Sequence, residues 1–387
     1  MDKHAIGRGI AGFVGLGVVG ALSALAVSAQ SKGPTDLVAQ GKQIFRYDTF
    51  GDERLWTDQL GMNAVVETVD PTTALKVGLK VDADALPPGA LESADLTSPA
   101  TTVALLKLDA VVGLKATVDA NNRITRLGVT CALCHSTVDD SVQKGIGHRK
   151  DGWPNRDLNV GAIIALSPAL PQAKKDVYNS WGPGKYDPRY NIDGKSTPLV
   201  LPPAYGLAKV KNETYTAEGP ISYWNAYVAV TQMGGQGHFS DPALGINVAL
   251  DPDLVTPKLP ALRAYQHSLP APEAPAGSFD AAAAQRGRTV FNRNCMSCHV
   301  GVDGTDNNGG NKLHAPEETG MDGAYAARTK NKGYRTTPLR GLPQHPPYFH
   351  DGSAATLADV VAHYNQARGL GLDAQAQSDL VEFLKSR

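Results

Sequence analysis

Two five-residue segments hold all four cysteines of this chain. They read Cys131-Ala-Leu-Cys134-His135 and Cys295-Met-Ser-Cys298-His299, so both follow the pattern C-x-x-C-H. In this pattern the thiols form thioethers to the vinyl groups of a haem, and the adjacent histidine ligates the iron. Two intervening residues on a helical turn place both sulfurs along one porphyrin edge and the imidazole beneath the iron. The sequence therefore predicts two covalently attached haem c groups.

Three other uses of these cysteines fit less well. A zinc site built from two C-x-x-C pairs would join segments that lie far apart in the sequence. A thioredoxin-like redox pair needs a βαβ context, for which the sequence gives no sign. Disulfides are common in exported proteins, but the histidine after each pair favours haem attachment. With both haems attached, no thiol remains for a disulfide or a thiolate catalyst.

The composition limits the classes of partner. The 387 residues carry 37 basic and 38 acidic side chains, and 42% of them are hydrophobic. A nucleic-acid-binding protein or a polybasic membrane binder needs a positive excess, so neither is expected. The hydrophobic content suffices for globular cores.

The N-terminus has the layout of a secretory signal peptide. Lys3 and Arg8 precede an uncharged stretch rich in Ala, Gly, Val and Leu, which ends in Val27-Ser28-Ala29. We expect cleavage before Gln30, with residues 1–29 removed and the mature protein periplasmic or otherwise exported. The alternative is an uncleaved N-terminal membrane anchor, because the stretch is nearly long enough to span a bilayer.

A partial repeat predicts two cytochrome c-like haem domains in a mainly α protein. Gln40-Gly-Lys-Gln-Ile-Phe45 is similar to Arg286-Gly-Arg-Thr-Val-Phe291, and each resembles the helix that precedes a haem motif in small cytochromes. The second copy lies just before Cys295, whereas the first lies far from Cys131. The N-terminal domain, residues 30–268, therefore carries a large insertion that includes the Leu/Val-rich run 102–118.

The remaining boundaries follow from local signals. The Pro-rich segment 269–277 is predicted to be a linker, and residues 278–387 are predicted to form the C-terminal haem domain. Ser278 is the expected cap of the next helix, and the last helix is expected to start near Asp373. No convincing alternating strand is visible anywhere in the sequence.

The function depends on the second axial ligand of each iron, because an electron-transfer haem has two protein ligands and a catalytic haem keeps a position open. Met1 lies in the signal and Met296 within its own motif, so only three methionines remain as ligands. These are Met62, Met233 and Met321.

The C-terminal segments Tyr334–Leu342, Pro347–Gly352 (PYFHDG) and Ala355–Tyr364 resemble the bacterial dihaem cytochrome c peroxidase/MauG family. The resemblance is specific over residues 291–387 and weak before them. It implies that Tyr364 is the distal ligand of the second haem, at a position that holds Met in typical peroxidases. Thr356 and Asp359 form a predicted capping pair, and Leu357, Val360, Val361 and Tyr364 share one helix face. The alternatives are a core tyrosine at 364 and His350 as ligand.

For the first haem, the resemblance implies a displaceable distal histidine, for which His148 is the candidate and His238 a second one. The family also uses a Glu before a Met to move the peroxide proton, and the counterpart here is Gln232 before Met233. Glutamine cannot take that proton. His148 or Asp151 would have to substitute for it, so His148, Gln232 and Asp151 are the candidate catalytic residues.

The resemblance also implies a tryptophan between the haems and a calcium ion between the domains. Of the four tryptophans in the chain, Trp153, Trp181 and Trp224 are the candidates. Arg335 and Arg340 are candidates for pairing with haem propionates. The calcium ligands would be the carbonyls of His345 and Pro347, with Asn155 or Asn159 opposite.

These features predict an exported dihaem oxidoreductase of the peroxidase type. The C-terminal haem, with His299 and Tyr364, would pass electrons from a small cytochrome or cupredoxin donor. The N-terminal haem, with His135, would meet peroxide or another small oxidant. The alternative is a non-catalytic electron-transfer protein whose two irons are both six-coordinate.

Overall fold

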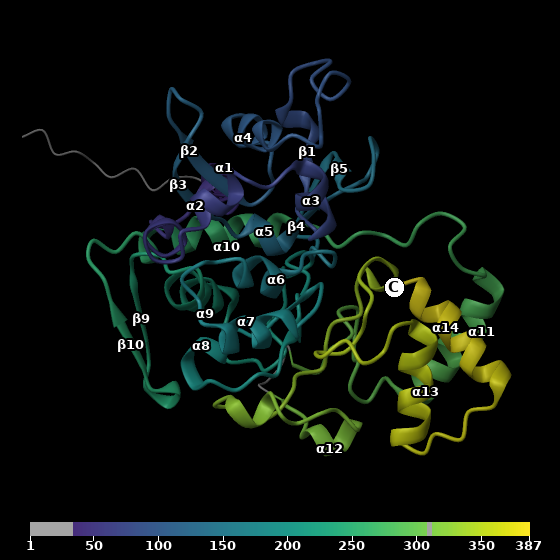
Figure 1. Cartoon of the computed structure of the whole chain (residues 1–387). Helices are drawn as coiled ribbons and strands as arrows, with labels where there is room; N and C mark the ends of the chain where they lie inside the picture. The colour runs from purple at the N-terminus through teal and green to yellow at the C-terminus, as the bar shows by residue number, and fades with distance from the viewer. Residues whose placement is uncertain (1–33, 308–311) are drawn as a thin grey trace, which may run out of the picture. The chain divides into compact units, whose positions relative to one another are not determined.

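A computed structural model describes residues 34–307 and 312–387 of the chain (Figure 1). The predicted signal peptide, residues 1–29, lies outside the described residues. Within the described ranges, no helix is both long and apolar enough to cross a membrane.

Helices dominate the described residues. They are α1 (Pro34–Tyr47), α2 (Met62–Val66), α3 (Pro71–Lys76), α4 (Pro99–Lys107), α5 (Ala132–His135), α6 (Val160–Ala165), α7 (Gln172–Asn179), α8 (Tyr190–Asp193), α9 (Ile221–Tyr227), α10 (Leu259–Ser268), α11 (Ala281–Asn294), α12 (Pro316–Thr319), α13 (Leu357–Ala367) and α14 (Ala374–Lys385). The predicted mainly α class is confirmed.

The expectation that the chain lacks strands is wrong. The strands are β1 (Val81–Asp82), β2 (Leu114–Val118), β3 (Ile124–Val129), β4 (Ser136–Val138), β5 (Ile146–Gly147), β6 (Arg149–Asp151), β7 (Lys185–Tyr186), β8 (Leu199–Val200), β9 (His238–Asp241) and β10 (Ile246–Ala249). They pair two by two, with only β1 and β5 parallel. Strands this short are fixed by their partners, so they leave little alternation in the sequence.

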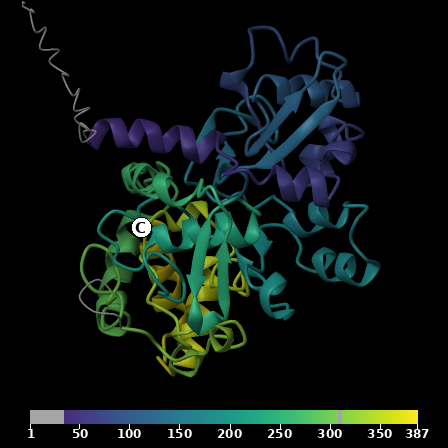
Figure 2. The ribbon, with the colours of Figure 1, turned by 90° about the vertical axis from the view of Figure 1, so that its left-hand side faces the viewer.

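Two of these pairs are hairpins. Strands β2 and β3 align Leu114 with Val129, and they lie within the predicted insertion. Strands β9 and β10 lie at the left edge in Figure 1 and face the viewer in Figure 2, so this hairpin is on the outside of the molecule.

The sequence repeat corresponds to two similar helix pairs. A Cβ added to Gly41 of α1 would lie 2.0 Å from the carbonyl oxygen of Ala261 in α10. A Cβ added to Gly287 of α11 would lie 1.9 Å from the carbonyl oxygen of Asp379 in α14. In both pairs the helices cross at a glycine because only a missing side chain allows the backbones to approach so closely. Phe45 and Phe291, which end the two repeats, are buried.

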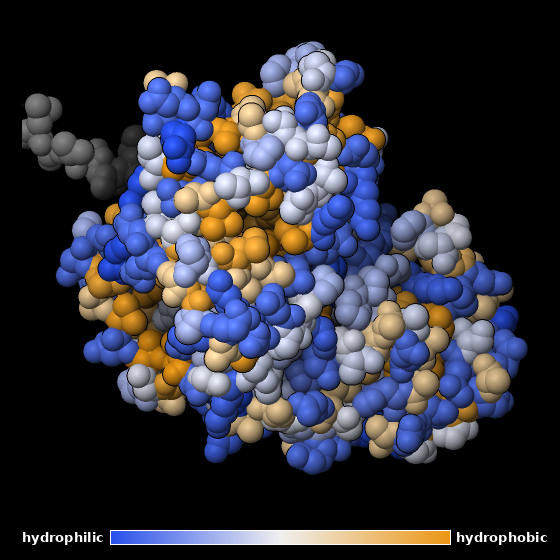
Figure 3. Space-filling model, viewed as in Figure 1, coloured by the Kyte–Doolittle hydropathy of each residue, from blue (hydrophilic) through white to orange (hydrophobic). Residues whose placement is uncertain are grey.

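Buried apolar side chains form two clusters. The larger cluster runs from Ile44 to Tyr265 and includes the partly buried Cys131 and Cys134 at its edge. The smaller cluster is built from α11, α13, α14 and the segment around Leu342. On the face shown in Figure 3, hydrophobic residues gather over the chain before residue 268, and only scattered ones lie over α11, α13 and α14.

Two of the three helix starts predicted from the sequence are confirmed. Asp373 caps α14 by accepting from the backbone nitrogen of Ala376, and Thr356 with Asp359 forms the expected capping box of α13. The expected cap at Ser278 is wrong, because α11 starts at Ala281. Asp280 is the better cap since its carboxylate accepts from two backbone nitrogens of the first turn.

Candidate haem-binding sites

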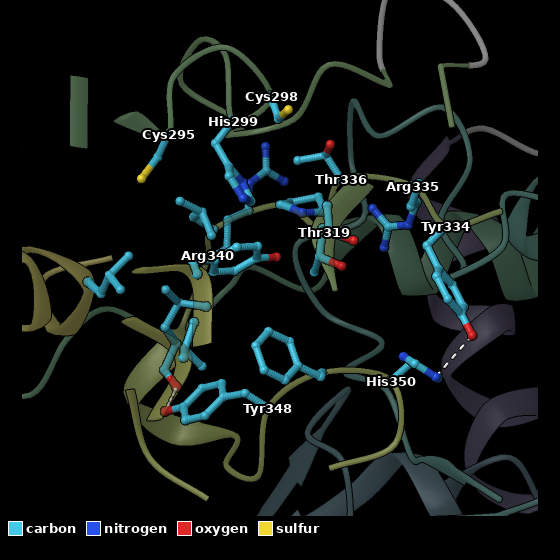
Figure 4. A pocket seen from close by; sticks show the side chains of 18 of the residues that line it. Cys295, Cys298, His299, Thr319, Tyr334, Arg335, Thr336, Arg340, Tyr348 and His350 are labelled. Atoms are coloured by element: carbon cyan, nitrogen blue, oxygen red, sulfur yellow. Dashed lines mark hydrogen bonds between the residues drawn. The ribbon is translucent and has the colours of Figure 1, made fainter. Parts of the chain in front are cut away.

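The second C-x-x-C-H motif forms a tight turn at the end of α11. The backbone nitrogens of Cys298 and His299 donate to the carbonyl of Cys295 at 3.2 and 3.0 Å. The turn brings both thiols and the imidazole to the wall of one cavity, into which His299 extends (Figure 4). All three residues of the motif therefore line the same cavity.

The walls of this cavity are mainly apolar and come from distant parts of the chain. Helices α11, α13 and α14 contribute Phe291, Leu357, Val361, Leu380 and Leu384, and the segment 202–215 closes the cavity from the N-terminal half of the chain. A porphyrin is a flat apolar group with two carboxylates at one edge. The donor set and the apolar walls fit that group.

Both motif histidines are held in the same way. Nδ1 of His299 lies 2.9 Å from the carbonyl oxygen of Gly304, and Nδ1 of His135 lies 3.1 Å from that of Pro202. A carbonyl only accepts, so each Nδ1 carries the proton and each Nε2 keeps its lone pair. Outer-shell contacts of this kind orient metal-ligating histidines. Burial lowers the pKa of His135 to about 4 and also lowers that of His299, which keeps both imidazoles neutral.

Tyr364 lines the same cavity as the second motif. It stands on α13 with Leu357, Val360 and Val361, all of which also line the cavity, so the predicted helix face is confirmed. Burial raises the pKa of Tyr364 to about 12, and the nearby Cys295 and Cys298 add to the effect. The phenol is therefore protonated at neutral pH in the absence of a cation, and a metal ion would have to displace its proton.

Two further side chains in this cavity bear on the distal ligand. Met321 lines the cavity, whereas Met62 and Met233 are buried in the larger apolar cluster. His350 also lines it, but its Nε2 is 3.0 Å from the hydroxyl of Tyr334 and the two rings stack at 4.3 Å (Figure 4). Met321 is thus a second ligand candidate beside Tyr364, and His350 is held in place by Tyr334.

The two predicted propionate partners differ in their surroundings. Arg340 donates to Asp303 and to the carbonyl of Gly206, so its guanidinium already has a carboxylate partner. Arg335 donates to the carbonyls of Thr214 and Glu213 and keeps Nη1 buried without a partner. Both residues line the cavity, and Arg335 is the one with an unpaired N–H donor for a propionate.

The first motif lies at the edge of the larger cluster. Its histidine ends α5, and the backbone nitrogen of Gly152 donates to the carbonyl of His135 at 2.8 Å. Burial raises the pKa of both Cys131 and Cys134 to about 12. Tyr186 is close enough to Cys134 for their charges to interact, and its own pKa is raised well above the usual value by burial. Both thiols of this motif therefore pack against the larger apolar cluster.

The three candidate catalytic residues have separate surroundings. The side chain of His148 is 63% exposed, and its Nδ1 lies 2.8 Å from Asp84, which raises its pKa. The amide oxygen of Gln232 accepts from the hydroxyl of Tyr186 at 3.0 Å. These contacts leave His148 in solvent and hold Gln232 in the interior.

Asp151 is fully engaged in a buried network. Its carboxylate pairs with Arg46 and Arg149 and accepts from Ser136 and Tyr265. Burial acts to raise the pKa of Asp151, but the arginines and hydrogen bonds lower it overall. The group is therefore a poor proton acceptor.

The other predicted residues are placed as follows. His238 is partly exposed on β9 and lies 2.8 Å from Asp251. Among the tryptophans, Trp181 packs on tyrosines and donates to Ser196, Trp224 packs on Tyr223 and Tyr227, and Trp153 packs on Tyr205.

The predicted calcium ligands are partly committed elsewhere. The carbonyl of His345 accepts from Arg156 at 3.0 Å, so a guanidinium already lies at that oxygen. Asn159 caps α6 by accepting from the backbone nitrogen of Ala162. Asn155 keeps a buried side-chain oxygen without a partner, and Pro347 lines the cavity of the second motif.

Sequence reasoning missed Arg156 and Tyr186. Neither belongs to a motif, and only the fold brings Arg156 to the second cavity and Tyr186 to Gln232. One group of metal-ligand atoms also occurs within the described ranges, formed by Cys298, Asp306 and His314. It shares Cys298 with the haem motif, and a thioether sulfur is no longer a thiolate ligand.

Residues 284–387 match the family described as cytochrome c. A cytochrome-c peroxidase of Denitromonas iodatirespirans is 29% identical over 151 residues, which cover 27% of this chain and 40% of that protein. The chain thus matches less than half the length of this relative. The C-terminal part is a cytochrome c domain, which implies covalently attached haem c, and the matches are consistent with the predicted peroxidase/MauG-like family.

Two solved structures are similar at 19% sequence identity each. One is a hydrazine synthase of Kuenenia stuttgartiensis, with a TM-score of 0.33 over 49% of this chain and 73% of that chain. The other is a MauG-like protein associated with microbial copper homeostasis, with a TM-score of 0.35 over 50% of this chain and 74% of that chain.

Proposed function

We propose that this chain is an exported dihaem oxidoreductase that reduces peroxide or another small oxidant with electrons from a small donor protein. The observation that carries the proposal is the shared arrangement of the two motifs. His135 and His299 each follow a C-x-x-C pair, and each has Nδ1 tied to a backbone carbonyl. Because the two motifs share both the cysteine pattern and this histidine contact, we expect each of them to carry a haem.

A bound haem supplies an iron that changes its oxidation state and can bind a small oxidant on an open face. The chain contributes the rest of the chemistry at the second site. His299 would hold the iron through Nε2, Tyr364 on α13 would offer a phenol oxygen as second ligand, and Arg335 would offer a buried donor to a propionate. A phenolate oxygen stabilises the ferric state, so Tyr364 as ligand lowers the reduction potential of this site.

A chain of aromatic side chains supports electron transfer between the two sites. Trp153 follows Gly152, whose nitrogen donates to the carbonyl of His135. Its ring lies 5.9 Å from that of Tyr205, which lies 6.5 Å from the ring of His345. Tyr205 and His345 line the second cavity. Trp153 is therefore our choice among the three candidate tryptophans for the residue between the haems.

Peroxide would react at the first site, with Gln232 as a hydrogen-bonding group. Its amide oxygen is held by Tyr186, and its amide nitrogen donates to Thr231 at 2.8 Å. Tyr186 stays protonated because burial keeps its pKa high. The pair can orient an oxygen atom, but neither member takes a proton at neutral pH.

That limit favours a second function, electron transfer without catalysis. A peroxidase moves one proton between the two peroxide oxygens, and this step contributes roughly 10²–10⁴ in rate. Asp151 is committed to two arginines, and His148 is in solvent. If none of these groups reaches the oxidant, the chain only carries electrons.

The donor protein would dock beside the second motif. Met296, Val300 and Val302 are 47, 39 and 85% exposed around the cysteine turn. Exposed apolar side chains next to a redox group suit a brief encounter with a cytochrome or cupredoxin. Replacing Val302 by Lys should raise the donor's KM.

The number of haems is tested by mass. Covalent haem resists acid extraction, so the intact protein is weighed after export in a host that attaches haem c. We expect two haems in the parent chain and one in each double variant, Cys131→Ser with Cys134→Ser and Cys295→Ser with Cys298→Ser. A parent chain with a single haem would refute the dihaem proposal.

The reaction is tested by spectroscopy of the ferric and the half-reduced protein. The enzyme proposal predicts a high-spin haem in one of these states and its change on adding hydrogen peroxide. If both haems stay low-spin in both states and do not respond to peroxide, the electron-transfer alternative is correct.

A further inference from the structure

Arg156 is a partly buried cation that has no carboxylate partner among the described residues. Its Nη2 donates to the carbonyl of His345 at 3.0 Å, while Nε and Nη1 are shielded from solvent and have no hydrogen-bond partner. Burial lowers the pKa of Arg156. Burying a guanidinium group with unpaired donors destabilises the folded protein unless an anion binds to those donors.

Other buried arginines of the described chain show the usual solution. Arg149 pairs with Asp151, Arg189 with Glu218, and Arg328 with Asp187. Each contact is at most 2.8 Å and nearly inaccessible to solvent. The protein thus supplies carboxylates where its own fold buries arginines, and the lack of one at Arg156 points to an anion from outside the chain.

Arg335 has the same deficiency in the same cavity. Its Nη1 is buried without a partner, and burial lowers its pKa to about 10. The nearby carboxylate of Glu213 is committed to His267 and to the backbone nitrogen of Ile221. Both arginines line the cavity together with Tyr215, and each of them acts to lower the pKa of Tyr215.

Two guanidinium groups that each lack an anion match the two propionates of one haem. We infer that Arg156 binds one propionate of the haem attached at Cys295 and Cys298, and that Arg335 binds the other. This inference rests on the proposed haem at the second motif. The haem at the second motif would thus be held in part by Arg156, which lies in the segment that contacts the first motif.

The position of Arg156 makes it a link between the two sites. The backbone nitrogen of Asn155, its neighbour, donates to the carbonyl of Cys134 at 2.9 Å. The guanidinium reaches the second cavity, and its charge is also felt by His135. A positive charge near a haem favours the reduced iron, which carries one positive charge less than the oxidised iron. Arg156 should therefore raise the reduction potential of the second haem.

The test is a redox titration of the full-length holoprotein with the variants Arg156→Gln and Arg156→Lys. The two haems are assigned beforehand with the Cys295→Ser, Cys298→Ser double variant. Arg156→Gln should lower the midpoint potential of the second haem. It should also make that potential depend on pH near neutrality, because a propionate without its guanidinium titrates higher. Arg156→Lys keeps the charge, so its shift should be smaller.

Arg263→Gln serves as the matched control, since Arg263 is exposed on α10 away from the cavity and should leave both potentials unchanged. If Arg156→Gln does not fold, resonance Raman of Arg156→Lys reports the propionate bending mode, which should shift because lysine lacks the forked donor. An unchanged second haem in both variants, or a shift confined to the first haem, overturns the inference. A parent chain without haem at Cys295 and Cys298 overturns the proposed function itself.

Discussion

Gly287 lies directly against the carbonyl group of Asp379 at the crossing of α11 and α14. A Cβ at this position would be 1.9 Å from that oxygen, and Gly41 has the same relationship to Ala261 where α1 crosses α10. The same close contact thus occurs in the helix pairs at both ends of the described chain. Each pair positions a buried phenylalanine, Phe45 or Phe291, one turn beyond the glycine.

The first prediction concerns this crossing. Gly287→Ala forces α11 and α14 apart, and overpacking of this kind costs about 1–3 kcal/mol. Chemical denaturation should show the loss as a lower midpoint. Thr289→Ala, on the exposed face of the same helix, is the control and should change stability by less than about 0.5 kcal/mol. Equal stability of the two variants would contradict the close contact.

The second prediction concerns the distal ligand of the second haem. Tyr364→Phe removes only the oxygen, so ligation by tyrosine predicts a changed spectrum and a higher midpoint potential of that haem. Tyr348→Phe removes a hydroxyl from the same cavity, where it donates to Leu342, and should change neither. If instead Met321→Leu alters the spectrum and Tyr364→Phe does not, the methionine is the ligand.

The third prediction concerns the dependence of stability on pH. Asp52 is buried, and both its oxygens lie 3.2 Å from the backbone nitrogen of Val129. Burial raises its pKa to about 9, so the folded protein keeps a proton that the unfolded chain releases above pH 3.8. Stability from this group is therefore lost as pH rises from about 4 to 9, by up to about 1.4 kcal/mol for each pH unit.

Asp52→Asn should remove this loss, because the amide does not ionise. Urea denaturation at pH 5 and pH 8 should show a smaller pH effect in the variant than in the parent chain. Asp58→Asn, at an exposed pair with Arg126, is the control and should follow the parent. A pH profile of Asp52→Asn identical to that of the parent would mean that Asp52 is ionised at neutral pH.

The fourth prediction concerns the first site. Gln232→Glu supplies a carboxylate where the present amide cannot accept a proton, so peroxide turnover should rise, by up to about 10²-fold. Stopped-flow spectroscopy of the half-reduced protein measures the rate. His148→Ala should leave the rate unchanged if His148 stays exposed beside Asp84. A Gln232→Glu variant that folds, binds both haems and reacts no faster would place the oxidant elsewhere.

Local sequence patterns were sufficient where neighbouring residues determine the structure. The C-x-x-C-H turns, the capping box of Thr356 and Asp359, and the apolar face that carries Tyr364 all depend on residues within two helical turns of each other. Short-range geometry is encoded by spacing alone, so these features agree with the structure. Ser278 failed as a cap because Asp280, two residues further on, offers a charged acceptor to the same helix.

Long-range contacts decided the rest. The short strands form only because a distant partner completes them, as when Ser136 pairs with Asp151. Asp151 and Gln232 have the right side chains for chemistry, yet their partners Arg46, Arg149 and Tyr186 use their hydrogen-bonding groups. The sequence shows which side chains could do chemistry, but it does not show which hydrogen bonds and ion pairs those side chains already make.

By itself, the sequence determined which residues are the candidates for haem attachment, because they share one five-residue pattern. Only the tertiary structure decided what surrounds those residues. It joined Tyr364 and His299 in one cavity and brought Arg156 there from beside the first motif. Among the described residues, it also left Arg156 and Arg335 without a carboxylate partner. Whether a buried charge is satisfied depends on groups that converge in space from distant positions, and no local pattern encodes that convergence.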